Sequence, residues 1–239
     1  MADDEGLLAV VTSANVACGF HAGDPSIMHR VCARAAALGV VVGAHVSYRD
    51  LIGFGRRAMA MAPDDLADDL AYQIGGLGAV ARAAGAPLRY VKAHGALYNQ
   101  ASDDEITARV VARAVAAVDI RLGVLCLPGS AMATAADAAG LRVIGEGYLD
   151  RAYDERGRLV ARSLPGAVIT DPDEVVARAV ALATAGSVRS VSGNDVAVDV
   201  QSLCTHGDTP AALDLARAAR RALVAAGVSL RPFIDDGGE

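Results

Sequence analysis

Short apolar runs alternate with amphipathic helical segments along the whole of this 239-residue sequence. The runs expected to form strands are 14–20, 40–46, 88–94, 122–127, 141–147 and 199–205, and a weaker run at 188–191 fits a small hairpin. Strands that alternate with helices are typical of a parallel sheet, because a helix carries the chain back to the start of the next strand. The sequence therefore predicts an α/β fold, as a closed barrel or an open doubly wound sheet, in a single domain over 1–239.

The ends of the helices are clearly marked. Asp24-Pro25 predicts a helix start and Gly39 its end, since aspartate caps the first turn, proline suits the first helical position and glycine suits the left-handed residue after the last turn. Asp171-Pro172 and Gly186 bound another helix in the same way. Further helices are expected from Pro63 to Gly85, from a capping box at 102–105 into 106–117, and from Asp208-Thr209-Pro210 to Gly227.

Composition narrows the class of partner. With 53% hydrophobic residues the chain can bury a large core, and its net charge of −6, without a basic stripe, argues against nucleic acid or an anionic membrane as partner. No apolar run reaches the roughly 18–20 residues that span a bilayer. The four cysteines form no C-x-x-C pair, so reduced core thiols are expected. These features predict a soluble, cytoplasmic protein that binds a small molecule or another protein.

Histidines mark the candidate site. Four of the five stand at predicted carboxyl ends of strands: His21, His45, His94 and His206. Parallel α/β folds keep their active sites at that end, so one shared site is a better explanation than four core histidines. Alternation along a strand places Tyr90, Lys92 and His94 on one face, and Asn15 and His21 on one face of another strand.

Lys92 is the only lysine, and the other 21 of the 22 basic residues are arginine. An ammonium is a compact point charge whereas a guanidinium is a wide fork, so a lysine inside a strand indicates a role that arginine cannot fill. We predict that Lys92 stabilises an anion. The alternative is a structural ion pair with a buried carboxylate such as Glu146. Because Lys92 is the sole lysine, the chain has no Walker A phosphate loop.

The other candidate groups have two interpretations each. Asp24 and Asp208 follow histidines at predicted helix starts, where capping is the commoner role and activation of water the alternative. Arg56 and Arg57 fit a solvated surface more often than an anion clamp. The histidines together with Asp24 and Asp208 suit a divalent metal such as zinc or manganese, with His21, His45 and His94 as the expected ligand set. Since Lys92 would repel a cation, stabilisation of an oxyanion or phosphate is the competing role.

Five segments carry a family resemblance: 13–25 (SANVACGFHAGDP), 43–45 (GAH), 53–57 (GFGRR), 91–99 (VKAHGALYN) and 204–208 (CTHGD). Together with the loop from Glu146 to Tyr153, they resemble the family of 5-oxoprolinase A subunits, also called the LamB/YcsF lactam-utilisation family. The segments stand in the family's order along nearly the whole chain. Two departures replace proline by Val46 and Ala93, which affects backbone rigidity more than chemistry.

The resemblance implies a TIM-like (β/α) barrel of the seven-stranded glycoside hydrolase/deacetylase type. The family's first strand, with its acidic residues, is expected to be missing here. The resemblance also implies ATP-dependent opening of the lactam 5-oxoproline (pyroglutamate) to L-glutamate with subunits B and C, ATP being bound through these partners. The expected catalytic residues are Lys92, His94, His45, His21, Asp24 and Asp208, and the expected substrate-binding residues are Asn15, His206, Glu146, Arg56, Arg57 and Tyr98. The alternatives are a stand-alone metal-dependent amidase or deacetylase and a non-catalytic substrate-binding subunit.

Overall fold

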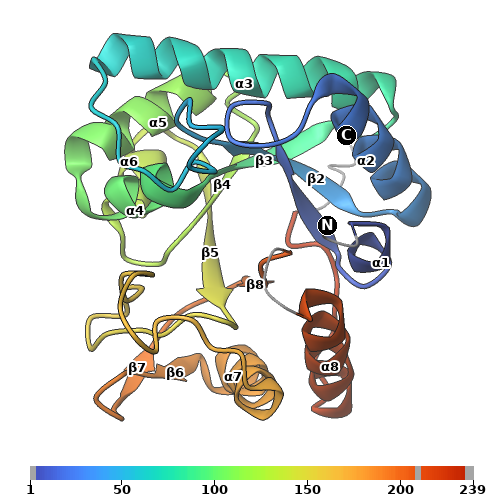
Figure 1. Cartoon of the computed structure of the whole chain (residues 1–239), viewed down its shortest axis with the longest axis vertical. Coiled ribbons are helices and arrows are strands. Elements are labelled where there is room, and N and C mark those ends of the chain that lie inside the picture. The colour runs from blue at the N-terminus through green and yellow to red at the C-terminus, as the bar shows by residue number, and fades with distance from the viewer. Residues whose placement is uncertain (1–3, 208–210, 235–239) are drawn as a thin grey trace. The chain divides into compact units, whose positions relative to one another are not determined.

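A computed structural model describes residues 4–207 and 211–234 (Figure 1). These residues fold as two compact units. The larger unit holds Thr12–Ile144 together with Ile234, and the smaller unit holds the described residues up to Val11 together with those of Gly145–Phe233. The single domain over 1–239 stays a prediction.

The larger unit contains a parallel sheet whose strand order, β1-β2-β3-β4, follows the chain. Its strands are β1 (Ser13–Ala17), β2 (Val41–Val46), β3 (Leu88–Ala93) and β4 (Gly123–Cys126), and β5 (Arg142–Tyr148) begins in this unit and ends in the smaller one. Its helices are α2 (Pro25–Leu38), α3 (Pro63–Ala83), α4 (Gly95–Asp103), α5 (Glu105–Val118) and α6 (Ala131–Ala138). The predicted α/β class with parallel strands is confirmed. The closed seven-stranded barrel stays a prediction.

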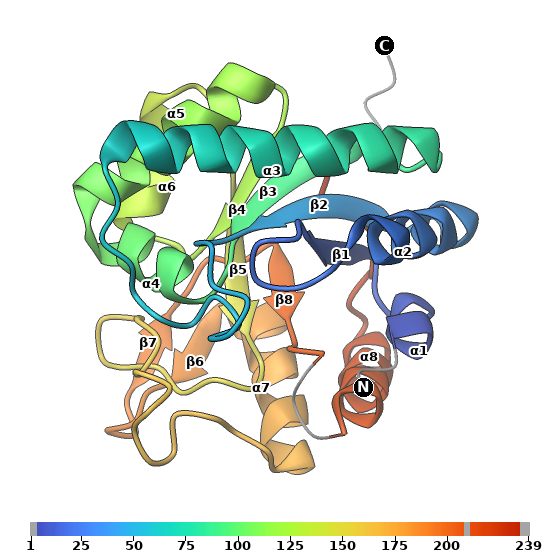
Figure 2. The ribbon, with the colours of Figure 1, turned by 45° about the horizontal axis from the view of Figure 1, so that its top comes forward.

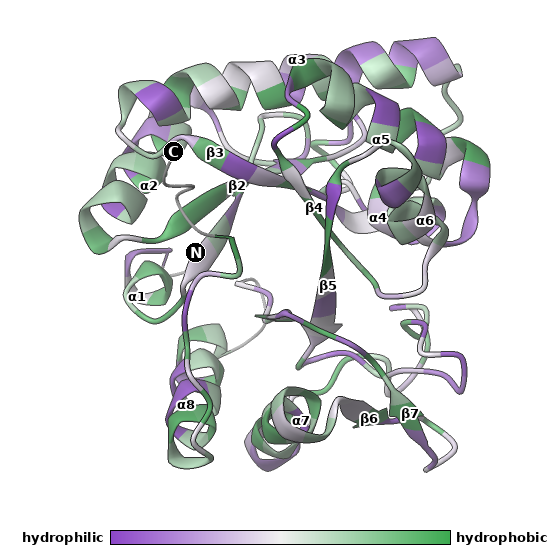
Figure 3. Cartoon of the chain, turned by 180° about the vertical axis from the view of Figure 1, so that it is seen from behind, coloured by the Kyte–Doolittle hydropathy of each residue, from purple (hydrophilic) through white to green (hydrophobic). Residues whose placement is uncertain are grey.

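The core of the larger unit lies between its sheet and α3, which runs along β2 and β3 (Figure 2). Val42 and Ala44 of β2 are at most 1% exposed, and so are Leu70, Ile74 and Leu77 of α3. The helices carry hydrophilic residues as well as hydrophobic ones (Figure 3), as expected for helices with one face on a core. Burial of these side chains is worth about 1.5–3 kcal/mol each and holds the helices on the sheet.

Most predicted helix ends are confirmed. Asp24 caps α2 and Gly39 follows it with φ 67°, while Asp171 caps α7 (Pro172–Ala185) and Gly186 follows with φ 60°. The predicted capping box at 102–105 is wrong. Asp104 caps α5, because residue 102 lies inside α4, a helix that the sequence analysis missed.

The smaller unit contains a parallel strand pair, a hairpin and three helices within the described residues. The end of β5 pairs with β8 (Ser202–Cys204), and β6 (Ser187–Arg189) pairs with β7 (Asp195–Ala197) antiparallel, which confirms the predicted hairpin. The helices are α1 (Asp4–Leu8), α7 and α8 (Ala212–Ala225). The predicted start of the last helix at 208–210 lies outside the described residues.

All four cysteines are free and buried, as predicted. Among the described residues, no helix is both long and apolar enough to cross a bilayer.

Candidate functional site

One face of the larger unit's sheet carries polar side chains. Strand register pairs Ala17 with His45, and His45 with Lys92. Two residues earlier it pairs Asn15 with Gly43. Because side chains alternate between the faces of a strand, Asn15, His45 and Lys92 lie on the same face. The sheet thus brings together three of the residues that the sequence analysis selected.

Gly43 makes room for an aromatic ring on this face. A Cβ atom at Gly43 would lie 2.3 Å from Cε2 of Tyr90, closer than carbon atoms approach. Tyr90 is 0% exposed and pairs with Gly43 across β2 and β3. The ring therefore covers the glycine and fills the sheet face beside Lys92.

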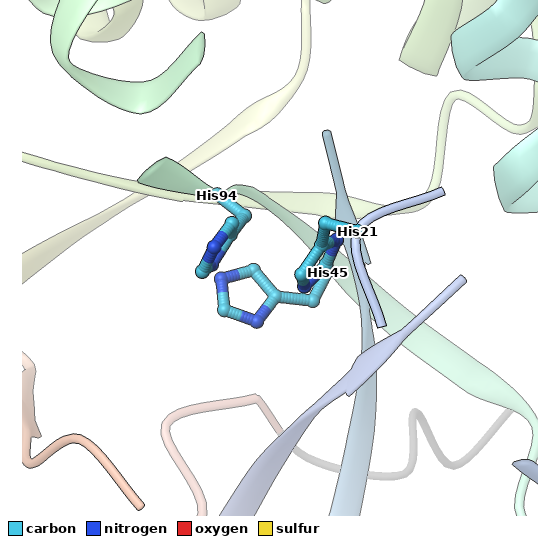
Figure 4. A group of neighbouring side chains, drawn as sticks. All are labelled: His21, His45 and His94. Carbon is cyan, nitrogen blue, oxygen red and sulfur yellow. The ribbon is translucent and has the colours of Figure 1, made fainter. Parts of the chain in front are cut away.

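Three imidazole rings meet at the carboxyl ends of β1, β2 and β3 (Figure 4). The rings of His21 and His94 stack, with centroids 3.9 Å apart and an interplanar angle of 9°. The ring of His45 meets both edge-on, with its centroid 5.5 Å from that of His21 and 4.7 Å from that of His94. One ring nitrogen from each residue lies within 4.8 Å of the others. We call this group the histidine cluster.

His21 enters the cluster from a turn rather than from a strand. Since β1 ends at Ala17, the prediction that strand alternation places Asn15 and His21 on one face is wrong. The turn is closed by a hydrogen bond from the Gly19 amide to the Ala22 carbonyl at 2.9 Å, and Gly19 adopts φ 88°, where glycine is favoured. This turn delivers His21 to the cluster.

The loop after β2 supplies a backbone partner for His94. The carbonyl oxygen of Phe54 accepts a hydrogen bond from Nε2 of His94 at 2.8 Å. Because a carbonyl only accepts, the hydrogen of a neutral His94 ring lies on Nε2, and Nδ1 carries the lone pair. The next carbonyl, of Gly55, accepts from the amide of Ala96 at 2.9 Å. The loop is therefore fixed to the start of α4.

Asp50 holds this loop in shape. Its carboxylate is 1% exposed and accepts hydrogen bonds from the Gly53 amide and from Nε of Arg57, each at 2.9 Å. Nη2 of Arg57 forms an ion pair with the same carboxylate. Arg57, predicted as a substrate-binding residue, thus has a structural partner, and its substrate role stays a prediction. Asp50 is not among the residues predicted from the sequence, although an aspartate three residues before a glycine is typical of a turn.

Acid is expected to weaken this loop only below about pH 4. The hydrogen bond from Arg57 lowers the pKa of Asp50 from 3.8 to about 2. Because the folded-state pKa is the lower one, the stabilisation is present above the unfolded-state pKa and is lost as the pH falls towards about 2. Chemical denaturation over a pH series measures the free energy of unfolding of wild type and of Asp50→Asn. The difference between the two proteins should shrink as the pH falls from 3.8 to about 2. A difference that stays constant over this range would contradict the assignment.

Lys92 is buried beside the cluster, with 3% of its surface exposed. Its Nζ lies 5.7 Å from the centroid of the Tyr98 ring, which belongs to α4. This distance is within the range of cation–π attraction. Tyr98, predicted only from the family resemblance, therefore contacts the lysine that the composition singled out. Glu146, the alternative partner of Lys92, lies in the smaller unit and is 1% exposed.

The protein environment keeps His21 uncharged at neutral pH. Burial, the neighbouring His94 and the guanidinium of Arg56 lower the pKa of His21 from 6.5 to about 3. Arg56 lies over the ring of Phe54, with Cζ 5.1 Å from its centroid. A neutral imidazole offers a lone pair to a hydrogen-bond donor or a metal ion.

Oδ1 of Asn15, Nδ1 of His21 and Oγ of Ser47 are buried in the larger unit and have no hydrogen-bond partner among the described residues. A buried polar atom without a partner costs about 1–3 kcal/mol. Native proteins seldom keep such atoms unless a ligand or water binds them. These atoms therefore indicate that water or a polar ligand binds on the side of the sheet that carries the histidine cluster.

Asp24 is exposed and caps α2, since its Oδ1 accepts a hydrogen bond from the Ile27 amide at 2.8 Å. The capping interpretation is confirmed, and a catalytic role for Asp24 stays a prediction. Asp208 lies outside the described residues, so both its predicted capping role and its predicted catalytic role stay predictions.

In the smaller unit, His206 pairs with a buried carboxylate. Nδ1 of His206 lies 2.9 Å from both carboxylate oxygens of Asp150, whose side chain is 0% exposed. The ring of Tyr148 stacks on that of His206 at 5.5 Å. Asp150 thus orients the ring and leaves Nε2 for other contacts. The substrate-binding roles of His206 and Glu146 stay predictions. The pairing of His206 with Asp150 is not predictable from the sequence, because 56 positions separate the two residues.

Comparison with known proteins identifies close relatives. The family described as LamB/YcsF matches residues 1–236. The A subunit of 5-oxoprolinase from Streptomyces coelicolor is 57% identical over 233 residues, covering 98% of this chain and 93% of the relative. The protein of the same name from Nocardia farcinica is 53% identical over 234 residues, with the same coverage. The crystal structure of a lactam utilization protein from Thermus thermophilus is 46% identical, with a TM-score of 0.91 over 97% of this chain and 92% of that one.

Proposed function

The chain belongs to the LamB/YcsF family, and from this premise we propose that it is the A subunit of a 5-oxoprolinase. Such an enzyme opens the lactam 5-oxoproline to L-glutamate and hydrolyses ATP. The observation that carries the proposal is the burial of Lys92 beside the histidine cluster, on the side of the sheet that has buried polar atoms without partners.

Coupling to ATP fits the chemistry of the substrate. An unstrained five-membered lactam is hydrolysed unfavourably near neutral pH. Transfer of the γ-phosphoryl group to the amide oxygen activates the ring carbon towards water. Water then adds, the carbon–nitrogen bond breaks as the nitrogen takes up a proton, and the resulting acyl phosphate is hydrolysed by a second water. Negative charge develops on oxygen in the phosphoryl transfer and again when the acyl phosphate is hydrolysed.

The larger unit is suited to stabilise that charge. Lys92 supplies a buried positive charge, which acts more strongly in a low-dielectric site than in water. His94 and His45 are placed to donate or accept protons at the same strand ends. Asn15 offers an amide to the substrate. Activation of water is assigned to Asp24 or Asp208, as in the prediction from the sequence.

ATP is expected to bind through partner subunits B and C. The relatives are themselves named as one subunit of an enzyme, which supports the existence of other subunits. The only lysine, Lys92, lies in β3 and not in a glycine-rich phosphate loop. We further propose that the protein acts in the cytoplasm and that its parallel strands belong to a seven-stranded type of barrel.

The test is an assay of ATP hydrolysis and glutamate formation with 5-oxoproline. The chain alone should be inactive, and activity should appear when the B and C subunits are added. If B and C together give full activity without this chain, the proposal is wrong. Normal 5-oxoproline binding by a chain that leaves the partners' ATP hydrolysis unchanged would instead identify a non-catalytic binding subunit.

A second candidate, a stand-alone metal-dependent amidase or deacetylase, is favoured by the three converging imidazoles. It would act without ATP or partners and lose activity on chelation. The same assay, run without ATP and with a chelator, separates the two candidates.

A further inference from the structure

We propose that His21, His45 and His94 bind one divalent transition-metal ion, with zinc the best fit and the fourth coordination position left for water or substrate. Three histidines with one open position are a common ligand set for zinc, and imidazole also suits other first-row transition metals. Such an ion would bind whether or not the chain takes part in lactam opening.

The ligand atoms are close to a coordinating arrangement. One ring nitrogen of each histidine lies within 4.8 Å of the others. Zinc–nitrogen bonds of about 2.0–2.1 Å in a tetrahedron place ligand nitrogens about 3.3 Å apart. The parallel rings of His21 and His94 must turn on binding, because lone pairs in parallel planes do not converge. Rotation of the His21 side chain on its turn would achieve this while His94 keeps its hydrogen bond to Phe54.

The surroundings of the cluster resemble a second coordination shell. Metal-binding histidines usually donate their other ring N–H to a carbonyl or carboxylate, which fixes the tautomer. His94 does so through Nε2 to the carbonyl of Phe54 at 2.8 Å, which directs Nδ1 to the ion. His21 is 3% exposed, and its Nδ1 has no partner among the described residues. A metal ion would satisfy this buried nitrogen.

Lys92 is the feature that opposes a cation. It pairs with His45 across β2 and β3, and neighbouring strands lie about 4.7–4.9 Å apart. Its ammonium would therefore repel the ion. Replacing Lys92 with methionine, which has similar length and no charge, should tighten zinc binding by about tenfold. A merely structural cluster would show no such dependence on the lysine.

The experiment measures zinc affinity on the purified chain, after treatment with chelator, by competition with a chromophoric chelator. Wild type should bind one ion, and His21→Gln, His45→Gln and His94→Gln should each weaken binding about tenfold or more. His29→Gln is the matched control, because His29 is exposed on α2 and outside the cluster. It should leave the affinity unchanged.

Two results would overturn the site: a wild-type chain that does not bind zinc, or one whose affinity the three cluster variants leave unaltered. If a variant does not fold, X-ray absorption of zinc-loaded wild type replaces it. Three imidazole nitrogens at about 2.0–2.1 Å would support the site, and a shell of oxygen or sulfur alone would reject it. Neither readout depends on lactam opening, so failure here is distinguishable from failure of the proposed function.

Discussion

Lys92→Ala is expected to lower 5-oxoproline-dependent ATP hydrolysis by about 10²–10³-fold in the complex assembled with the B and C subunits. The side chain is 3% exposed, so its charge acts in a water-poor site where solvent cannot replace it. The loss should fall on kcat, because in the proposed mechanism the negative charge near Lys92 develops during the reaction.

Two further variants sharpen this test. Lys92→Arg should also be impaired, since the wider guanidinium does not fit the space of an ammonium beside Tyr98. Arg82→Ala, which removes one positive charge from the exposed surface of α3, should behave like wild type. If Lys92→Ala hydrolyses ATP with 5-oxoproline at a near-normal rate, Lys92 has no role in catalysis.

Gly55→Ala is expected to lower the free energy of unfolding by about 2–5 kcal/mol. Gly55 has φ 67°, and a Cβ there would lie 2.3 Å from Oγ of Ser47 and 2.7 Å from Cδ2 of His94. The left-handed conformation costs about 1–2 kcal/mol and the steric overlap about 1–3 kcal/mol. Activity should fall as well, because the overlap displaces the ring of His94. Urea denaturation measures the change in stability.

Gly39→Ala is the matched control for this change. Gly39 also has φ 67°, but a Cβ there would meet no atom within 4 Å. Gly39→Ala should therefore lower the free energy of unfolding only by the roughly 1–2 kcal/mol that the left-handed conformation costs. If the free energy of unfolding falls equally in the two variants, the close packing of Gly55 against His94 does not contribute to stability.

The strands and most helix ends could be predicted because their signals are local. Apolar runs mark β2 and β3, and the aspartate–proline and glycine pairs mark α2 and α7. The short helices α4 and α6 were missed. α4 starts at Gly95, directly after a strand, and no side chain caps its first turn. The start of this helix therefore carries no capping residue from which it could be predicted.

The parts of the candidate site that could be predicted are side chains whose residue type and position along a strand indicate their chemistry. His45, Lys92 and His94 follow from strand ends and alternation. The carbonyl of Phe54 is a backbone atom, and no residue type indicates where it points. Asp150 was missed for another reason: its contact with His206 depends on the pairing of β5 with β8, which tertiary structure sets.

The loop from residue 47 to residue 57 links the ends of three strands through its backbone. The Asp50 amide bonds to the carbonyl of Phe20 at 3.0 Å, after β1, and the carbonyls of Phe54 and Gly55 bond to His94 and Ala96, after β3. The tip of the same loop is exposed, with Ile52 at 93%. At the exposed tip, the length of the loop is therefore under tighter constraint than the identity of the residue. Substitutions at Ile52 should be tolerated, whereas deletion of that one residue would shift the register of the following carbonyls and detach the loop from α4.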